Sequence, residues 1–307
     1  MGMRRPAITF WIGLAVIIAA EILLAVDVTH RDARGATSPL RVAHWVAINM
    51  TPVAWVGFLL IADGLLGTVS PARTRPRRFA VCFVSGVGVW LFFDWVNFYF
   101  IHAWSYDGLD AVGVVHGWVA RFVAFGAISP ALFMTAELYQ RLGLARLRGP
   151  RLAIGPRVRV AMLIIGVPAL LFPFFVQRPI GSLTLWVGVM LVLDPLNFRF
   201  GGPTQPTLIR DWRNGRWGRT GSLLAAGLTC GVLWEFWNYW ALARWTYDLP
   251  FLGPLEDYRL FEMPLLGFTG FPPFALECWV AFQTILLVLR KVGVRFVEPL
   301  PGDDAVL

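Results

Sequence analysis

Long apolar runs alternate with short polar segments along this chain of 307 residues. A helix that spans a bilayer needs about 20 mainly apolar residues, and runs of roughly that length recur from one end of the chain to the other. The pattern predicts an all-α fold, a polytopic transmembrane helical bundle of about eight helices. The expected helices are Ala7–Val26, Trp45–Gly67, Phe79–His102, Val114–Leu142, Val158–Val176, Ser182–Asn197, Thr220–Ala243 and Pro272–Leu289.

Composition supports a lipid environment for these helices. Hydrophobic residues make up 57% of the chain and charged residues 15%, and the mean hydropathy is +0.62. A soluble domain usually carries about 25% charged residues. The shortage of charge therefore favours a membrane protein over a soluble one.

The basic residues indicate an orientation in the cell (cytoplasmic) membrane. Twenty of the 27 Lys and Arg residues lie on one side of the expected bundle and six on the other. Because cytoplasmic loops carry the excess of basic residues, we expect both termini in the cytoplasm. The basic connection 199–219 contains Trp212 and Trp217, which suits contact with anionic headgroups. We therefore expect membrane lipids, and no nucleic acid, as partners.

Two stretches of the chain repeat each other at a constant offset of 141 residues. Acid, Asn, Trp, hydroxyl residue, Tyr and Asp recur in the same order in both copies. The matching segments are Asp94–Asn97 with Glu235–Asn238 and Trp104–Asp107 with Trp245–Asp248. This similarity predicts two four-helix repeats, residues 1–150 and 151–307. An even number of spans in each would make the repeats parallel.

Two acidic residues in this repeat are the leading candidates for chemistry. Asp94 and Glu235 lie inside apolar runs, where an acid costs roughly 2.5–3.5 kcal/mol on insertion scales. Asn97 and Asn238 follow one turn later, so we expect each amide to hydrogen-bond and orient its carboxyl group. A carboxyl group kept neutral by burial is a proton donor. The alternative is a hydrogen bond that only clamps helices together.

Glu137 and Glu277 are secondary acid candidates, because each follows proline in the last span of its repeat. Proline frees backbone carbonyls and often marks a broken helix beside a cavity. The segment 261–274 contains three Pro and two further Gly residues, and the sequence leaves open whether it is a loop or a re-entrant segment.

Aromatic residues surround the leading acids. We expect Trp95, Trp234, Trp237 and Tyr239 to line a substrate cavity, where aromatic faces attract a cation. The Trp and Tyr residues at 104, 106, 245 and 247 fit an aromatic belt at the membrane interface.

Several motifs are absent from the sequence. His and acidic residues do not pair at a helical spacing that suits a metal. The chain also lacks an aspartate-rich motif for magnesium-diphosphate, a Gly-rich phosphate loop and a Gly-x-Ser-x-Gly elbow. We therefore expect no metal and no other cofactor, and prenyl transfer from a diphosphate is disfavoured.

The order of these motifs resembles the duplicated three-helix units of lycopene-cyclase-type membrane proteins from bacteria and archaea. An acid that ends an apolar run is followed by Trp, Tyr-Asp, a Gly/Pro stretch, then Pro and Glu, and Leu191–Arg199 is similar to the Leu-Asp segment of those units. The resemblance implies acid-initiated, redox-neutral cyclisation of a polyisoprenoid. In that family paired glutamates follow the proline, whereas here Leu138 follows Glu137 and Cys278 follows Glu277. Segments 234–240 and 261–267 also resemble a bacterial multi-pass membrane family of uncharacterised function.

Three functions remain open on the sequence. The leading hypothesis is a membrane-embedded enzyme, cyclase- or isomerase-like, that acts on an isoprenoid or another apolar lipid through Asp94 and Glu235. The second is a proton- or cation-coupled transporter, since parallel repeats and buried acids also suit transport. The third is a membrane scaffold without catalysis.

Overall fold

The computed structural model describes residues 6–30, 38–109, 112–294 and 306–307. Five of the arginines counted for orientation lie outside the described residues, namely Arg4, Arg5, Arg31, Arg34 and Arg295. The described part of the chain is almost entirely helical, and its strands are short.

Eight long helices account for most of the structure. They are α1 (Ile8–Thr29), α3 (Met50–Leu66), α5 (Pro76–Val96), α6 (Val114–Arg141), α7 (Pro156–Phe175), α8 (Gly181–Phe200), α10 (Gly218–Trp240) and α11 (Phe271–Lys291). Seven of them, all except α10, are long and apolar enough to cross a membrane. Helix α10 has the length of a span but carries Glu235 and Asn238. The prediction of a polytopic helical bundle is confirmed.

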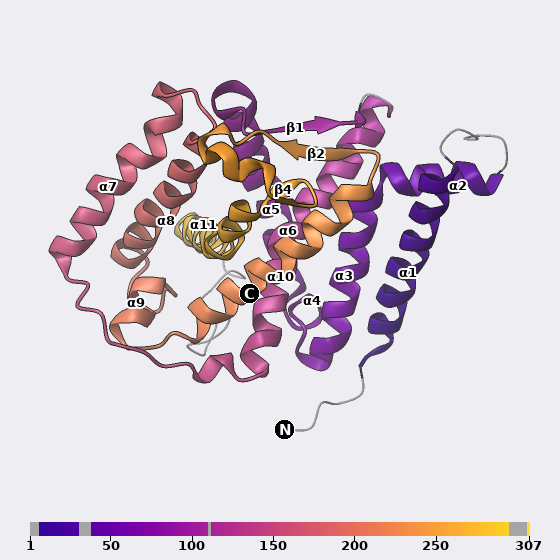
Figure 1. Cartoon of the computed structure of the whole chain (residues 1–307). Coiled ribbons are helices and arrows are strands. Elements are labelled where there is room, and N and C mark those ends of the chain that lie inside the picture. The colour runs from indigo at the N-terminus through magenta and orange to yellow at the C-terminus, as the bar shows by residue number, and fades with distance from the viewer. Residues whose placement is uncertain (1–5, 31–37, 110–111, 295–305) are drawn as a thin grey trace.

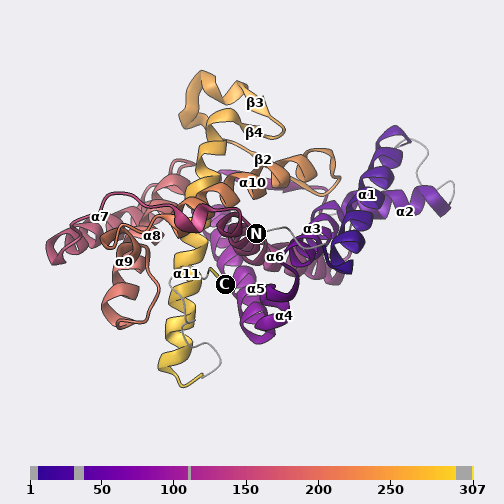
Figure 2. The same cartoon turned by 90° about the horizontal axis from the view of Figure 1, so that it is seen from below.

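The helices form two flanks around a central group (Figures 1 and 2). On one flank α1 packs against α3, and on the other α7 packs against α8. In the centre α6 contacts α3, α5 and α10, while α11 contacts α10, α8 and α5. Helix–helix contact is close where glycine removes the side chain. A Cβ on Gly227 of α10, for example, would lie 2.3 Å from the Phe271 carbonyl oxygen.

Two short strands join the central helices at one end of the bundle. Helix α5 continues as a π-helical turn, Asn97–Ile101, and the chain reverses at His102, which has a left-handed φ of 57°. Strand β1 (Trp104–Asp107) follows and pairs antiparallel with β2 (Arg244–Tyr247), which comes after α10. Gly108 ends β1 with φ of 74°, and a Cβ there would lie 2.1 Å from the Leu242 carbonyl oxygen.

Shorter elements complete the connections. Helices α2 (Ser38–Ile48), α4 (Pro71–Thr74) and α9 (Leu208–Arg213) lie between the long helices. After β2 come a 3-10 segment (Pro250–Asp257), strands β3 (Arg259–Leu260) and β4 (Met263–Pro264), and a second 3-10 segment, Leu265–Gly270. The segment 261–274 thus contains β4, the 3-10 segment and the first residues of α11. Strand β4 lies beside β3, as Figure 2 shows.

The basic connections meet at the other end of the bundle. Arg148 and Arg216 form a backbone bridge between the α6–α7 and α9–α10 connections. Arg75 lies 3.9 Å from the carboxyl of Glu137 at the end of α6, and Arg290 of α11 hydrogen-bonds the side chain of Gln205. The side of the membrane that this end faces stays a prediction.

Candidate functional site

The carboxyl group of Asp94 is buried at the end of α5 and accepts hydrogen bonds from β1. The Trp104 indole nitrogen donates to Oδ1 at 3.0 Å. The Tyr106 hydroxyl donates to Oδ1 and Oδ2 at 3.0 and 3.2 Å, and Trp90 donates to the same hydroxyl at 3.2 Å. Both carboxylate oxygens of Asp94 therefore have a partner.

Glu235 of α10 has the corresponding surroundings. The Tyr247 hydroxyl donates to Oε1 at 2.8 Å and Trp245 donates to the same oxygen at 3.3 Å. Trp245 also donates to the Tyr247 hydroxyl at 2.8 Å. The second oxygen, Oε2, is buried and has no hydrogen-bond partner among the described residues. An unpaired buried polar atom of this kind is costly, which sets Glu235 apart from Asp94.

The two asparagines hold the strands and not the carboxyl groups. Asn97 donates to the Trp104 carbonyl at 2.7 Å and accepts from the Trp104 amide at 3.2 Å. Asn238 makes the same pair of bonds with Trp245, at 2.7 and 2.9 Å. The prediction that each amide bonds its carboxyl group is therefore wrong. The buried backbone groups of Trp104 and Trp245 need hydrogen-bond partners, and the two amides supply them.

The register of β1 and β2 gathers four aromatic side chains. Trp104 pairs with Tyr247 and Tyr106 with Trp245. Because alternate residues of a strand face opposite sides, these four side chains share one face. Ser105 and Thr246 pair on the other face, with their hydroxyl oxygens 3.1 Å apart.

An aromatic cavity lies beneath this face. Its volume is about 280 Å³, and all four strand aromatics line it. Trp90 of α5 and Trp234 of α10, with ring centroids 5.0 Å apart, form another wall together with Phe274 of α11. The 3-10 segment Leu265–Gly270 closes the cavity from the β4 side. Asp94 and Glu235 are not part of this lining. Each accepts a hydrogen bond from a tyrosine that does line the cavity, Tyr106 or Tyr247.

The tyrosine hydroxyls remain proton donors in this setting. Burial raises the pKa of Tyr106 well above its ordinary value, and the nearby Asp94 adds to the effect. Burial and the carboxyl of Glu235 likewise raise the pKa of Tyr247. Each hydroxyl therefore keeps its proton over the physiological range.

The charges around the two carboxyl groups differ. The cationic Arg121 of α6 acts on Asp94, and Arg121 lines a smaller void of about 70 Å³ together with Tyr106. The charged group that acts on Glu235 is Glu262, whose carboxyl is itself paired with Arg244 at 3.0 Å. A positive neighbour favours the carboxylate form and a negative one opposes it. The clearer difference between the two acids is geometric, because both oxygens of Asp94 have a partner and Glu235 Oε2 has none among the described residues.

Several predicted site residues lie elsewhere. Trp95 is 45% exposed and packs against Phe100 and Phe174. Trp237 is buried against Trp55 at 5.2 Å, outside the lining of the cavity. Tyr239 contacts Trp240 and Phe261. Of the four residues predicted to line the cavity, the structure places Trp234 there.

The predicted aromatic belt at 104, 106, 245 and 247 is wrong. Trp104 and Trp245 are each 8% exposed, because Asn97 and Asn238 hold strands β1 and β2 against the bundle. Four residues of the site were therefore not predicted from the sequence, namely Tyr106, Tyr247, Trp90 and Phe274. The alternation Trp-x-Tyr in both repeats was the available signal.

The secondary acids are separated from this cluster. Glu137 accepts from the Leu307 amide at 3.2 Å and faces Arg75. Glu277 is buried in α11, and its Oε2 has no partner among the described residues. It lines a separate groove between α5, α8 and α11.

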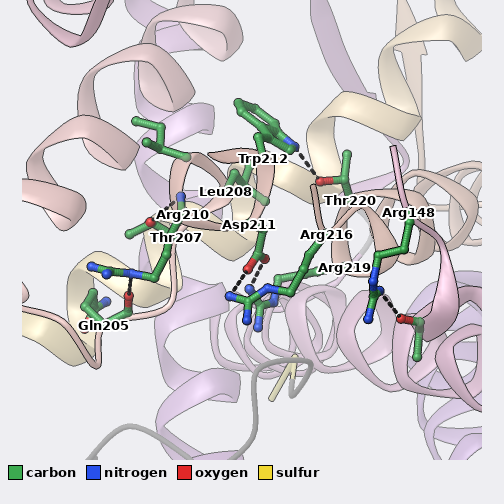
Figure 3. Close-up of polar contacts among 12 residues, drawn as sticks. Arg148, Gln205, Thr207, Leu208, Arg210, Asp211, Trp212, Arg216, Arg219 and Thr220 are labelled. Atoms are coloured by element: carbon green, nitrogen blue, oxygen red, sulfur yellow. Dashed lines mark hydrogen bonds and ion pairs between the residues drawn. The ribbon is translucent and has the colours of Figure 1, made fainter. Parts of the chain in front are cut away.

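A polar cluster on the α9 connection holds the basic end together (Figure 3). Asp211 pairs with Arg216 at 3.0 Å and with the buried Arg219. Asp194 of α8 accepts the amides of Leu208 and Ile209 at 3.0 and 2.9 Å, at the start of α9. These acids are satisfied by neighbouring groups, so their role is structural.

Within the described residues, no group of three or more His, Cys, Asp or Glu side chains is arranged to hold a metal ion. Comparison with protein-family models, curated proteins and solved structures gave no match for this chain. The resemblance to lycopene-cyclase-type proteins therefore stays a prediction.

Proposed function

We propose that the protein is a membrane-embedded enzyme that isomerises or cyclises an apolar lipid of the isoprenoid class by acid-initiated chemistry. The observation that carries this proposal is the aromatic cavity between two buried carboxyl–Trp–Tyr clusters. The supporting features are an apolar cavity, protonated hydroxyls at its wall and carboxyl groups behind them.

Glu235 and Tyr247 together serve as the acid. The Tyr247 hydroxyl gives its proton to a carbon–carbon double bond, whose π electrons form the new C–H bond and leave a carbocation on the neighbouring carbon. In this step Glu235 is protonated on Oε1 and is the donor across the 2.8 Å contact with the Tyr247 oxygen, so its proton replaces the one that Tyr247 gives to the substrate. A second double bond can attack this cation and close a ring, which moves the positive charge to another carbon. With or without ring closure, a C–H bond beside the cation then breaks, its electrons form a new double bond, and its proton returns through Tyr247 to the carboxylate of Glu235. No electrons are gained or lost overall.

The rest of the cavity stabilises the cation. The faces of Trp90, Trp234 and Phe274 lie around the space that the substrate would occupy, and aromatic faces attract positive charge. Asp94, which accepts hydrogen bonds from Trp104 and Tyr106, supplies a negative charge behind Tyr106 in this mechanism. Preorganised charge of this kind is the usual source of transition-state stabilisation.

Two observations weigh against the other hypotheses. An ion or proton pathway is lined by polar or charged groups, whereas this cavity is lined mainly by aromatic and aliphatic side chains. A purely structural acid would be expected to have both oxygens bonded, but Glu235 Oε2 is buried without a partner among the described residues. The enzyme is therefore the better supported function.

We also propose that residues 1–150 and 151–307 are two repeats within the cytoplasmic membrane, with both termini inside. The strand register supports the repeats, because Ser105 faces Thr246 and each Trp faces the Tyr of the other half. A two-fold axis through the Ser105–Thr246 pair produces this arrangement.

The test compares lipid extracts by mass spectrometry from cells that lack the gene and from cells that express the wild type, Glu235→Gln or Tyr247→Phe. We expect a lipid product of unchanged mass and altered retention time in the wild type. Both variants should lower its yield by about 10²-fold or more, the usual scale for loss of a general acid.

Asp248→Asn is the matched control, since this exposed acid follows Tyr247 directly and should leave the yield unchanged. Expression and monodispersity of every variant are checked in mild detergent. Identical lipid profiles with and without the gene, or a full yield from Glu235→Gln, would contradict the proposal.

A further inference from the structure

A large groove runs along α5, from Arg77 to Phe93, and along α11, from Glu277 to Leu289. It has a volume of about 950 Å³ and apolar walls, and it is more open than the aromatic cavity. Val84 and Phe92 line it and are 59% and 41% exposed. In a bilayer such exposed apolar side chains face lipid tails, so the groove is open to the membrane interior.

The groove and the aromatic cavity are lined by the same three helices, α5, α8 and α11. On α11 the cavity is lined up to Phe274 and the groove begins at Glu277, one turn later. On α8 the corresponding residues are Trp186 and Val189. On α5 the two linings overlap, because the groove is lined from Arg77 to Phe93 and Trp90 lines the cavity. One helical turn therefore separates the two spaces on α8 and α11, and on α5 they lie side by side.

Two phenylalanine rings form the partition. Phe93 lines the groove and Phe274 lines the cavity, and their ring centroids are 6.5 Å apart. Phe274 is also 5.9 Å from Trp90 and 6.4 Å from Trp234. The partition is made of side chains alone, and rotamer changes would connect the two spaces.

Glu277 stands at the junction. Its side chain is 2% exposed, it lines the groove, and its Oε2 has no partner among the described residues. A buried carboxyl oxygen without a partner is costly, and a hydrogen-bond donor on a bound molecule would satisfy it. The groove thus offers long apolar walls and one polar contact.

We propose that the groove and the cavity are two sections of one site for a long apolar lipid with a hydroxyl group near one end. Glu277 accepts a hydrogen bond from that hydroxyl at the junction. The long chain lies in the groove, and the short end passes Phe93 and Phe274 into the aromatic cavity. This inference rests on the proposed function, because it names the substrate class and the route from the bilayer.

The dimensions fit such a ligand. A cavity of about 280 Å³ is at the small end for a drug-sized molecule, so most of a long lipid must lie outside it. Phe271 and Leu289 mark the ends of the combined lining on α11. They are 18 residues apart, or about 27 Å at the helical rise, close to the thickness of the bilayer hydrocarbon core.

Native mass spectrometry of the full chain in detergent tests this site directly. The probes are geranyllinalool, a C20 isoprenoid alcohol with its hydroxyl near one end, and its methyl ether, which cannot donate. We expect the wild type to bind the alcohol about tenfold more tightly than the ether, the value of one good hydrogen bond. Glu277→Leu should bind both probes equally.

Two tryptophan substitutions on α11 locate the site. Ala281→Trp fills the groove and should reduce binding of both probes at least tenfold, since Ala281 is in its wall. Val288→Trp is the matched control, because Val288 is 55% exposed and outside both linings, and it should bind like the wild type. Equal binding of alcohol and ether to the wild type, or full binding by Ala281→Trp, overturns the inference.

Binding and reaction are separated by Glu235→Gln. This variant should retain the preference for geranyllinalool while it loses the lipid product. If no product is found for any variant but the probe binds as expected, the site stands and the proposed chemistry fails.

Discussion

Asp94 and Glu235 occupy matching clusters but are not interchangeable. The aspartate has both oxygens within reach of Tyr106. The glutamate is one methylene longer, so only Oε1 meets Tyr247 and Trp245, and Oε2 remains unpaired among the described residues. Two acids placed in unlike environments commonly divide the roles of proton donor and charge stabiliser.

The asparagine–strand contacts give a prediction at the same scale. Asn238→Ala should lower the free energy of unfolding by about 3 kcal/mol, because it leaves the Trp245 amide and carbonyl buried without partners. Denaturant unfolding in mild detergent measures the change. Asn214→Ala serves as the control, because Asn214 is exposed. A loss below about 0.5 kcal/mol for Asn238→Ala would show that water or another group replaces the amide.

Among the secondary-structure elements, the long helices follow from local pattern and the strands do not. The predicted Val114–Leu142 ends within one residue of α6 (Val114–Arg141), because twenty or more apolar residues have few alternatives in a membrane. Strands β1 and β2 are each four residues long, and the paired residues Ser105 and Thr246 are 141 positions apart in the chain. Their partner is set by tertiary contacts, which hydrophobic periodicity does not report.

The same limit explains why some predicted site residues line the cavity and others do not. The repeated acids could be found because charge is rare in apolar runs, and burial of both is confirmed. Trp95 and Tyr239 could not be separated from Trp234 on sequence, because all three lie beside the acids and only the helix rotation decides which one faces inward.

Close packing between α10 and α11 gives a prediction about elements. Gly227→Ala should destabilise the protein by about 1–3 kcal/mol, since the new Cβ would lie 2.3 Å from the Phe271 carbonyl oxygen. Gly88→Ala in α5 has open space around its Cβ and should raise stability by up to about 1 kcal/mol through helix propensity. Thermal unfolding in the same detergent compares them. If both variants behave alike, backbone contact does not limit the approach of α10 and α11.

At the scale of the whole molecule, polar groups are divided between two ends. The strand pair and the aromatic cavity lie at one end, and the basic connections with the α9 cluster lie at the other. Arg75 and Arg148 from separate connections, and Arg290 near the end of α11, take part in contacts there. This segregation agrees with the bias expected for cytoplasmic segments and supports the proposed orientation.

Cysteine labelling tests that orientation. Arg213→Cys is placed on the basic end and Tyr258→Cys on the strand end, and both positions are exposed. A membrane-impermeant maleimide should label Tyr258→Cys in intact spheroplasts and Arg213→Cys only in inverted vesicles. The native cysteines Cys82, Cys230 and Cys278 are buried and provide the unlabelled background. The opposite labelling pattern would place the termini outside.

Because β1 pairs with β2, the number of residues between each asparagine and its strand determines which side chains face the cavity. One residue inserted between Ala103 and Trp104 would turn Trp104 and Tyr106 to the opposite face. Both carboxyl groups would lose donors together, because each strand is held by the other. Homologous chains that keep this site should therefore vary in the α6–α7 connection and yet tolerate no insertion or deletion in the few residues between each asparagine and its tyrosine.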